Sequence, residues 1–107
     1  MITCDFTIIP IGNGTSCKNY VTAAVQAIKD SGLNYQLTGM GTLIEAENLE
    51  ELYSAIANAQ KAIFEMGAGR VYSVIKIDDR RDMKNRTLDS KVNSVKEILK
   101  WKNKVRI

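Results

Sequence analysis

The chain has 107 residues, of which 45% are apolar and 25% charged, a composition typical of a globular protein with one hydrophobic core. No apolar run approaches the roughly 20 residues that a membrane-spanning helix needs, and the N-terminal residues lack the basic leader of a secretory signal. The two cysteines of such a chain are expected to be thiols, and the protein is expected to be cytoplasmic. The length predicts one domain over residues 1–107.

The charge is distributed unevenly along the chain. Residues 1–79 carry five basic and nine acidic side chains, a net −4, whereas residues 80–107 carry ten and three, a net +7. The basic C-terminal third could bind nucleic acid or an anionic surface. Alternatively, it forms a solvated helix whose charge is complemented by an acidic part of the molecule. The second interpretation is favoured because no aromatic residue is interleaved with the basic ones before Trp101.

The first two elements follow from hydrophobic periodicity. Apolar and polar residues alternate over residues 2–8, which predicts a strand with one buried face that ends at Pro10. Apolar residues at helical spacing predict a helix over residues 17–31. Thr15 or Ser16 is expected to cap its start.

Two short β-type runs, residues 35–38 and 42–45, flank a Gly-Met-Gly tripeptide at 39–41. One interpretation is a hairpin with a glycine turn. In the other, the glycines leave backbone N–H and C=O groups uncovered and the methionine forms a flexible apolar flap. The hydroxyls of Thr38 and Thr42 then complete the rim of a small-molecule pocket.

The remaining elements complete the topology. Asn48 followed by Glu51 resembles a capping box, and the apolar spacing beyond it predicts a second helix that ends at Gly67. A strand over residues 71–77 and an amphipathic helix over residues 88–101 follow. The element order predicts an α+β fold, a ferredoxin-like βαββαβ sandwich with an additional C-terminal helix.

Such a sheet has a second face that the first two helices do not cover. We call it the open face, and the alternation places on it Thr3, Asp5, Thr7, Tyr72, Val74 and Lys76. It is too apolar to remain bare, so the third helix, other subunits or both are expected to cover it. The sequence therefore predicts a homo-oligomer.

Several kinds of chemistry lack the residues that they need. The chain has no histidine, two cysteines and no phosphate-binding glycine loop, so we predict no catalytic residue and no metal site. RNA binding on the sheet needs exposed aromatic residues, and the open face offers only Tyr72. The charged run at residues 78–82 could bind a metal or a phosphate. Pairing across a subunit interface or capping of the following segment is the favoured interpretation.

Three segments together resemble the small thiamine-binding protein family, whose members are ferredoxin-like. They are residues 8–12 with Ser16 beyond them, residues 35–45, and residues 70–82. The resemblance covers residues 2–100. It implies a subunit that assembles into dimers and then tetramers and binds unphosphorylated thiamine, or its hydroxymethylpyrimidine portion, without catalysis.

The resemblance gives the candidate residues roles. An aminopyrimidine presents adjacent donor and acceptor sites that a glycine-turn backbone and Thr42 can match. A flat thiazolium cation favours an aromatic face or a carboxylate, which Tyr35 and Glu45 offer. Met40 would close over the rings, and Ser16 would bond a polar end of the ligand. The predicted ligand-binding residues are Ser16, Tyr35, Thr38, Gly39, Met40, Gly41, Thr42 and Glu45, with thiamine as ligand and no cofactor.

The predicted function is a non-catalytic carrier, buffer or sensor of a thiamine-like molecule. One alternative is an oligomeric structural or regulatory protein without a dedicated ligand. Another is a module that binds anions or nucleic acid through the basic C-terminal helix.

Overall fold

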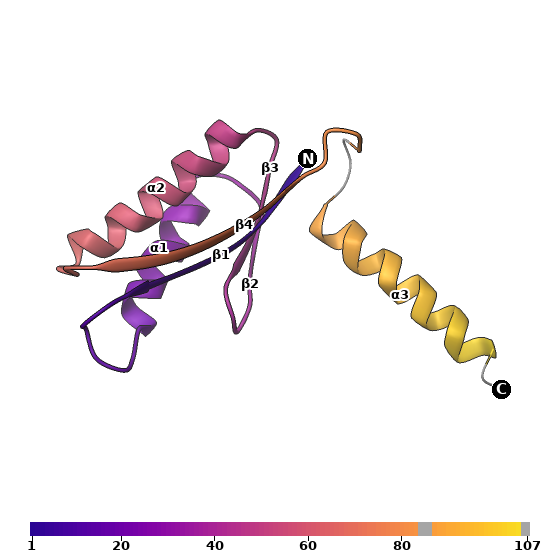
Figure 1. Cartoon of the computed structure of the whole chain (residues 1–107), viewed down its shortest axis with the longest axis horizontal. Coiled ribbons are helices and arrows are strands. Elements are labelled where there is room, and N and C mark those ends of the chain that lie inside the picture. Colours follow the sequence, from indigo (N-terminus) through magenta and orange to yellow (C-terminus); the bar gives the residue numbers. More distant parts are fainter. Residues whose placement is uncertain (84–86, 106–107) are drawn as a thin grey trace.

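A computed structural model describes residues 1–83 and 87–105, the last four of these by their backbone alone. The elements are β1 (Ile2–Pro10), α1 (Lys18–Asp30), β2 (Tyr35–Leu37), β3 (Thr42–Ala46), α2 (Leu49–Glu65), β4 (Val71–Asp79) and α3 (Leu88–Val105). The strands form an antiparallel sheet in the order β2-β3-β1-β4, and α1 and α2 lie against one of its faces (Figure 1). The predicted ferredoxin-like fold with an additional C-terminal helix is confirmed.

The central strand β1 is paired unequally along its two edges. Its ladder with β3 ends at the pair Phe6–Thr42, whereas its ladder with β4 continues to the pair Pro10–Val71. Residues 7–10 therefore have a paired neighbour on the β4 side only. This difference in length creates the space in which the candidate site lies.

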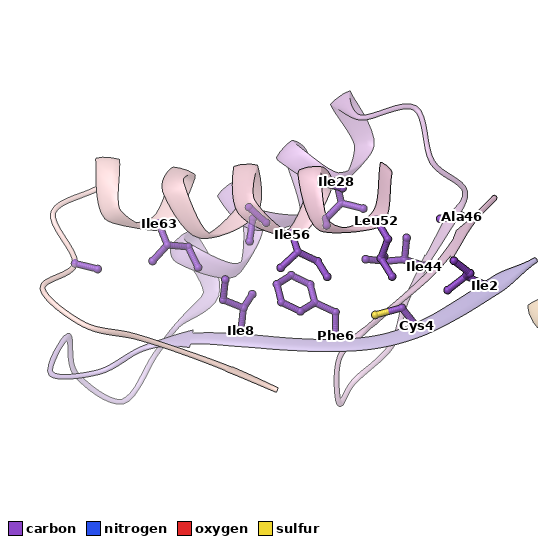
Figure 2. Close-up of a cluster of buried hydrophobic side chains, with 14 residues drawn as sticks. Ile2, Cys4, Phe6, Ile8, Ile28, Ile44, Ala46, Leu52, Ile56 and Ile63 are labelled. Carbon is purple, nitrogen blue, oxygen red and sulfur yellow. The ribbon is translucent and has the colours of Figure 1, made fainter. Parts of the chain in front are cut away.

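The core lies between the sheet and its two helices. Alternate residues of β1 point toward α1 and α2, as the period-two pattern predicts (Figure 2). The largest fully buried side chains are Phe6, Ile28, Ile44, Leu52 and Ile63. Cys4 belongs to the same cluster, and burial raises the pKa of its thiol to about 11.

The residues at the start of α2 and after the ends of α1 and α2 adopt the conformations that their residue types favour. The Asn48 side chain accepts a hydrogen bond from the Glu51 N–H at 2.9 Å, which confirms the predicted cap. Gly32 and Gly67 follow α1 and α2 with φ of +81° and +97°, a conformation that glycine adopts without steric cost.

The predicted cap of α1 is wrong. The N-cap position is Cys17, which makes no side-chain capping bond, and Thr15 and Ser16 precede it in the loop. A contact from the loop to the helix joins the two segments instead, since the Asn13 amide donates to the Tyr20 hydroxyl at 3.1 Å.

Only the first turn of α3 lies against the sheet. The Thr87 hydroxyl accepts from the Ser90 N–H at 3.1 Å and starts the helix, which then projects away from the sheet (Figure 1). The radius of gyration is 16.6 Å, against about 13 Å for a compact chain of 100 residues. The expectation that the third helix covers the open face is thus met only at one end of the sheet. None of the helices in the described ranges is long and apolar enough to cross a membrane.

Candidate ligand-binding site

The tip of the β2–β3 hairpin, residues 38–41, is closed by hydrogen bonds from threonine side chains. The Thr38 hydroxyl accepts from the N–H groups of Met40 and Gly41 at 3.3 and 3.1 Å and donates to the Gly41 carbonyl at 2.8 Å. Thr7 of β1 donates to the Met40 carbonyl at 3.0 Å. The prediction that the glycine turn leaves its backbone groups uncovered is therefore wrong for Met40 and Gly41. The cause is local, because the short hydroxyl side chain of a threonine next to a turn forms hydrogen bonds with the backbone groups of that turn.

The two glycines of the tip have different reasons to be there. Neither has a positive φ, so backbone handedness does not require them. A Cβ on Gly41 would lie 2.9 Å from Thr7 Oγ1 and 3.1 Å from the Phe6 carbonyl oxygen, whereas a Cβ on Gly39 would meet nothing within 4 Å. Gly41 therefore permits close approach of the tip to β1, and Gly39 does not have this role.

A cavity of about 170 Å³ lies between the tip, the end of β1 and α1. Cavities near 150 Å³ hold a benzene-sized ring, so this one matches a single flat six-membered ring. Most of its walls are apolar, from α1 on one side and β1 below. The lining residues are Phe6, Thr7, Ile8, Ile9, Val21, Ala24, Val25, Ile28, Leu37, Thr38, Gly39, Met40, Gly41 and Thr42.

The Thr42 hydroxyl is one polar group of this cavity. Thr42 is only 6% exposed, and its hydroxyl makes no hydrogen bond within the part of the chain that the structure describes. A buried hydroxyl without a partner costs free energy that a ligand atom can recover.

The main chain of Ile8 supplies the other polar groups. The Ile11 N–H donates to the Arg70 carbonyl at 2.8 Å, which shows that odd-numbered residues of β1 face β4. In an antiparallel strand the even-numbered residues then face the other edge, and the Phe6 carbonyl does lie beside Gly41. Ile8 is the next even residue, and β3, which is described throughout, has no residue paired with it. Its N–H and C=O therefore point toward the cavity.

Ile8 is not among the site residues that the sequence predicts. The feature of the sequence that could have indicated Ile8 is the first strand, which is longer than the two strands of the hairpin. That signal has no meaning until the register between the strands is known.

Five of the eight predicted site residues meet at this cavity, namely Thr38, Gly39, Met40, Gly41 and Thr42. Met40 is 88% exposed, as a flap over the opening would be.

The other three predicted residues lie elsewhere. Ser16 is exposed in the loop before α1. Tyr35 and Glu45 line a separate hollow of about 320 Å³ beside Leu88, and the Glu45 carboxylate accepts from the Leu88 N–H at 2.8 Å. The structure therefore does not bring these side chains to the ring-sized cavity.

A larger and more open hollow of about 560 Å³ lies between the end of α1 and the start of α2. It is lined by polar groups that include Glu45, Glu47 and Glu51. A flat heterocycle is held better by a less open, apolar cavity with a few placed polar groups, so the smaller cavity is the stronger candidate.

The charged run at residues 78–82 is paired within the chain. Arg80 donates two hydrogen bonds of 2.8 Å to Asp82, and Arg81 lies 3.3 Å from Asp79. The bond from Arg80 holds the pKa of the Asp82 carboxyl at about 2. Among the described residues, no group of three or more acidic or cysteine side chains could hold a metal ion. The interpretation of pairing across a subunit interface stays a prediction.

These features define a ferredoxin-like domain with a ring-sized cavity at the unpaired end of its central strand. The chain belongs to the thiamine-binding protein family, whose model matches residues 4–96.

Relatives and solved structures agree with this assignment. A UPF0045 protein of Methanothermobacter thermautotrophicus is 51% identical over 91% of this chain and 98% of its own. The UPF0045 protein YqgV of Bacillus subtilis is 44% identical over 92% and 98%. The structure of a hypothetical protein from Methanocaldococcus jannaschii matches with a TM-score of 0.81 and 32% identity, covering 90% of this chain and 96% of that one.

A Thermotoga maritima protein, provisionally assigned to thiamine biosynthesis or salvage, matches with a TM-score of 0.74. Its identity is 19%, over 88% of this chain and 97% of its own. This likeness shows the fold alone.

Proposed function

We propose that the protein binds thiamine or its hydroxymethylpyrimidine moiety without catalysing a reaction, and acts as a carrier, buffer or sensor. Membership of the thiamine-binding protein family supports a thiamine-related role. The observation that carries the proposal is the ring-sized cavity, which combines apolar walls with the buried Thr42 hydroxyl and the unpaired main chain of Ile8.

The polar groups of the cavity complement an aminopyrimidine. This ring carries an exocyclic amine, which donates, next to a ring nitrogen, which accepts. The C=O and N–H of Ile8 offer the matching acceptor and donor, and the Thr42 hydroxyl can serve as either. The apolar side of α1 would contact one face of the ring, and Met40 would cover it with a polarizable thioether.

The volume and the polar groups of the cavity support enclosure of the pyrimidine ring of thiamine. Because about 170 Å³ accommodates one ring, the pyrimidine would be enclosed and the thiazolium would extend past the exposed Met40. A phosphate on the far end of thiamine would then lie outside the cavity.

Isothermal titration calorimetry with hydroxymethylpyrimidine, thiamine and thiamine phosphates tests the proposal. We expect heat with both hydroxymethylpyrimidine and thiamine, a rise in melting temperature with each, and recovery of unchanged ligand after incubation. No heat and no change in melting temperature with any of them would refute it.

We also propose that the protein self-associates to a dimer or tetramer. Tyr72 and Val74 are exposed on the open face of the sheet, and the apolar residues of α3 are exposed beyond its first turn. Such surfaces are typical of interaction sites. Light scattering at micromolar concentration should give the mass of a dimer or tetramer, and a monomer would contradict the proposal.

A further inference from the structure

Met40 lies at the rim of the ring-sized cavity with its side chain almost entirely in solvent. It is 88% exposed, the highest value among the large apolar side chains of the described residues. An apolar side chain left in water does not stabilise the core, so packing of the fold does not account for a methionine at this position. The cavity that Met40 lines offers another account of it.

The backbone of Met40 is fixed although its side chain is free. The Met40 N–H donates to the Thr38 hydroxyl at 3.3 Å, and the Met40 carbonyl accepts from the Thr7 hydroxyl at 3.0 Å. The neighbouring Gly39 also borders open space, since a Cβ there would meet nothing within 4 Å. An unbranched thioether side chain rotates about three bonds. Met40 can therefore cover the opening of the cavity, or leave it, without a change in the backbone.

The other methionines of the chain are less open to solvent. Met66, which follows α2, is 44% exposed, and Met83 is 43% exposed. The sulfur of Met83 also accepts a hydrogen bond from Arg80 Nη2 at 2.9 Å, and Met1 is partly buried. A thioether is oxidised through a sulfur lone pair that the oxidant has to reach. Met40 is therefore the least protected of the four methionines.

We infer that Met40 is a site of reversible oxidation that controls binding of the ligand in the cavity. The inference rests on the proposed function and adds regulation of the same site. The oxidant is a peroxide, and the product is methionine sulfoxide.

The oxidation of Met40 is a two-electron step. The sulfur lone pair bonds to one oxygen of hydrogen peroxide, and the O–O bond breaks. The other oxygen takes the proton of the transferred hydroxyl and leaves as water. The sulfur loses two electrons and the peroxide gains them. A thiol-dependent sulfoxide reductase reverses the step, since two thiols become a disulfide and the oxygen leaves as water.

Oxidation changes the contact that Met40 makes at the rim. A thioether is apolar and polarizable and packs favourably against a ring, whereas a sulfoxide is polar. The cavity walls are mostly apolar, so a sulfoxide that folds over the ring would lose its hydration without a new partner. A sulfur–ring contact accounts for up to about a tenfold change in affinity. In the other direction, a bound ring that Met40 covers shields the sulfur from peroxide.

Peroxide treatment of the full chain followed by peptide mass spectrometry tests the selectivity of the oxidation. We expect Met40 to gain one oxygen several times faster than Met66 or Met83. Saturating hydroxymethylpyrimidine should slow the oxidation of Met40 and leave the rate at Met83 unaltered, because Met83 does not line the cavity. Preferential oxidation of Met66 or Met83, or a rate at Met40 that does not respond to hydroxymethylpyrimidine, would overturn the inference.

Isothermal titration calorimetry of the treated protein tests the effect on binding. Affinity for hydroxymethylpyrimidine should fall by about fivefold to tenfold, and methionine sulfoxide reductase with a thiol reductant should restore it. The melting temperature of the ligand-free protein should not change, because the Met40 side chain makes few contacts. A lower melting temperature would mean that oxidation acts on the fold, which would contradict the inference.

Two leucine variants identify the residue that responds to peroxide. Met40→Leu cannot form a sulfoxide but retains both cysteines, Cys4 and Cys17. Whatever its starting affinity, peroxide should not change it. Met83→Leu retains Met40 and should lose affinity on treatment as the wild type does. A loss of affinity in treated Met40→Leu would assign the effect to another side chain and overturn the inference.

The outcomes separate this inference from the proposed function. Binding heat with untreated protein, and the same affinity after Met40 is oxidised, would leave ligand binding standing and overturn its control by oxidation. No heat with the untreated protein would refute the proposed function, and the inference would fall with it.

Discussion

The polar side chains at the two ends of the sheet have different hydrogen-bond partners. At the hairpin tip, the hydroxyls of Thr7 and Thr38 bind the backbone of the tip itself, and what remains is an apolar cavity with the Thr42 hydroxyl and the main chain of Ile8. At the opposite end, one side chain from each strand reaches outward to α3.

The difference follows from where the ladders end. The β1–β3 ladder stops at Phe6 while β1 continues, which leaves a short main-chain edge that suits a small ring. At the other end the ladders of β1 run to Ile2, so only side chains are available for binding. Those side chains hold the first turn of α3: Glu45 accepts from a helix N–H, and the other three bond the side chains of Asp89 and Lys91. One sheet can therefore offer a candidate ligand site at one end and an anchor for α3 at the other.

Gly41→Ala should give the largest effect, because it acts on both the fold and the cavity at the tip. The added Cβ would meet Thr7 Oγ1 and the Phe6 carbonyl, and overpacking of this kind costs about 1–3 kcal/mol. Urea denaturation should show that loss, and calorimetry should show no binding of hydroxymethylpyrimidine. Gly39→Ala is the control and should be close to wild type, since its Cβ meets nothing within 4 Å. Equal losses for both variants would contradict the close-approach role of Gly41.

Thr42→Val should separate ligand binding from stability. The substitution removes a buried hydroxyl that has no partner among the described residues, so the free energy of unfolding should not fall. Affinity for hydroxymethylpyrimidine should weaken by about 1–3 kcal/mol. Thr42→Ser retains the hydroxyl and should keep more of the affinity. Unchanged affinity of Thr42→Val would remove this residue from the site.

Lys91→Met should affect the other end of the sheet alone. It removes the bonds to Thr3 and Asp78, and an exposed or half-exposed pair of this kind contributes about 1 kcal/mol or less. Hydrogen exchange should show lower protection in α3, while ligand affinity stays at the wild-type value. Lys96→Met makes the same charge change at an exposed position and should leave the protection of α3 unaltered. A change in ligand affinity with Lys91→Met would mean that the two ends are coupled.

The smallest effect concerns Cys4, which lies between the two ends where β1 is paired on both sides. Burial raises the pKa of its thiol to about 11, so at pH 8 only about one molecule in a thousand carries the reactive thiolate. Iodoacetamide should modify the partly exposed Cys17 first and reach Cys4 only after denaturation or near pH 11. Rapid modification of Cys4 at pH 8 in the native protein would show that this part of β1 opens.

Local sequence patterns were enough to predict the helices and strands and part of the candidate site. The alternation in residues 2–8, the helical spacing in both early helices and the Asn48 cap each describe contacts within a few positions of one another. The Gly-Met-Gly tripeptide marked the tip correctly, because its composition is itself the local signal. These features follow from backbone geometry that a short segment imposes on itself.

Tertiary structure alone decided the remaining features. The unpaired edge at Ile8 depends on how far β3 extends beside β1, and the direction of α3 depends on four side chains from four strands. Tyr35 and Glu45 are near Thr42 in the sequence, yet they line another hollow. Register and helix direction are set by pairing between distant segments, and no pattern within one segment records which residues of another segment will lie beside it.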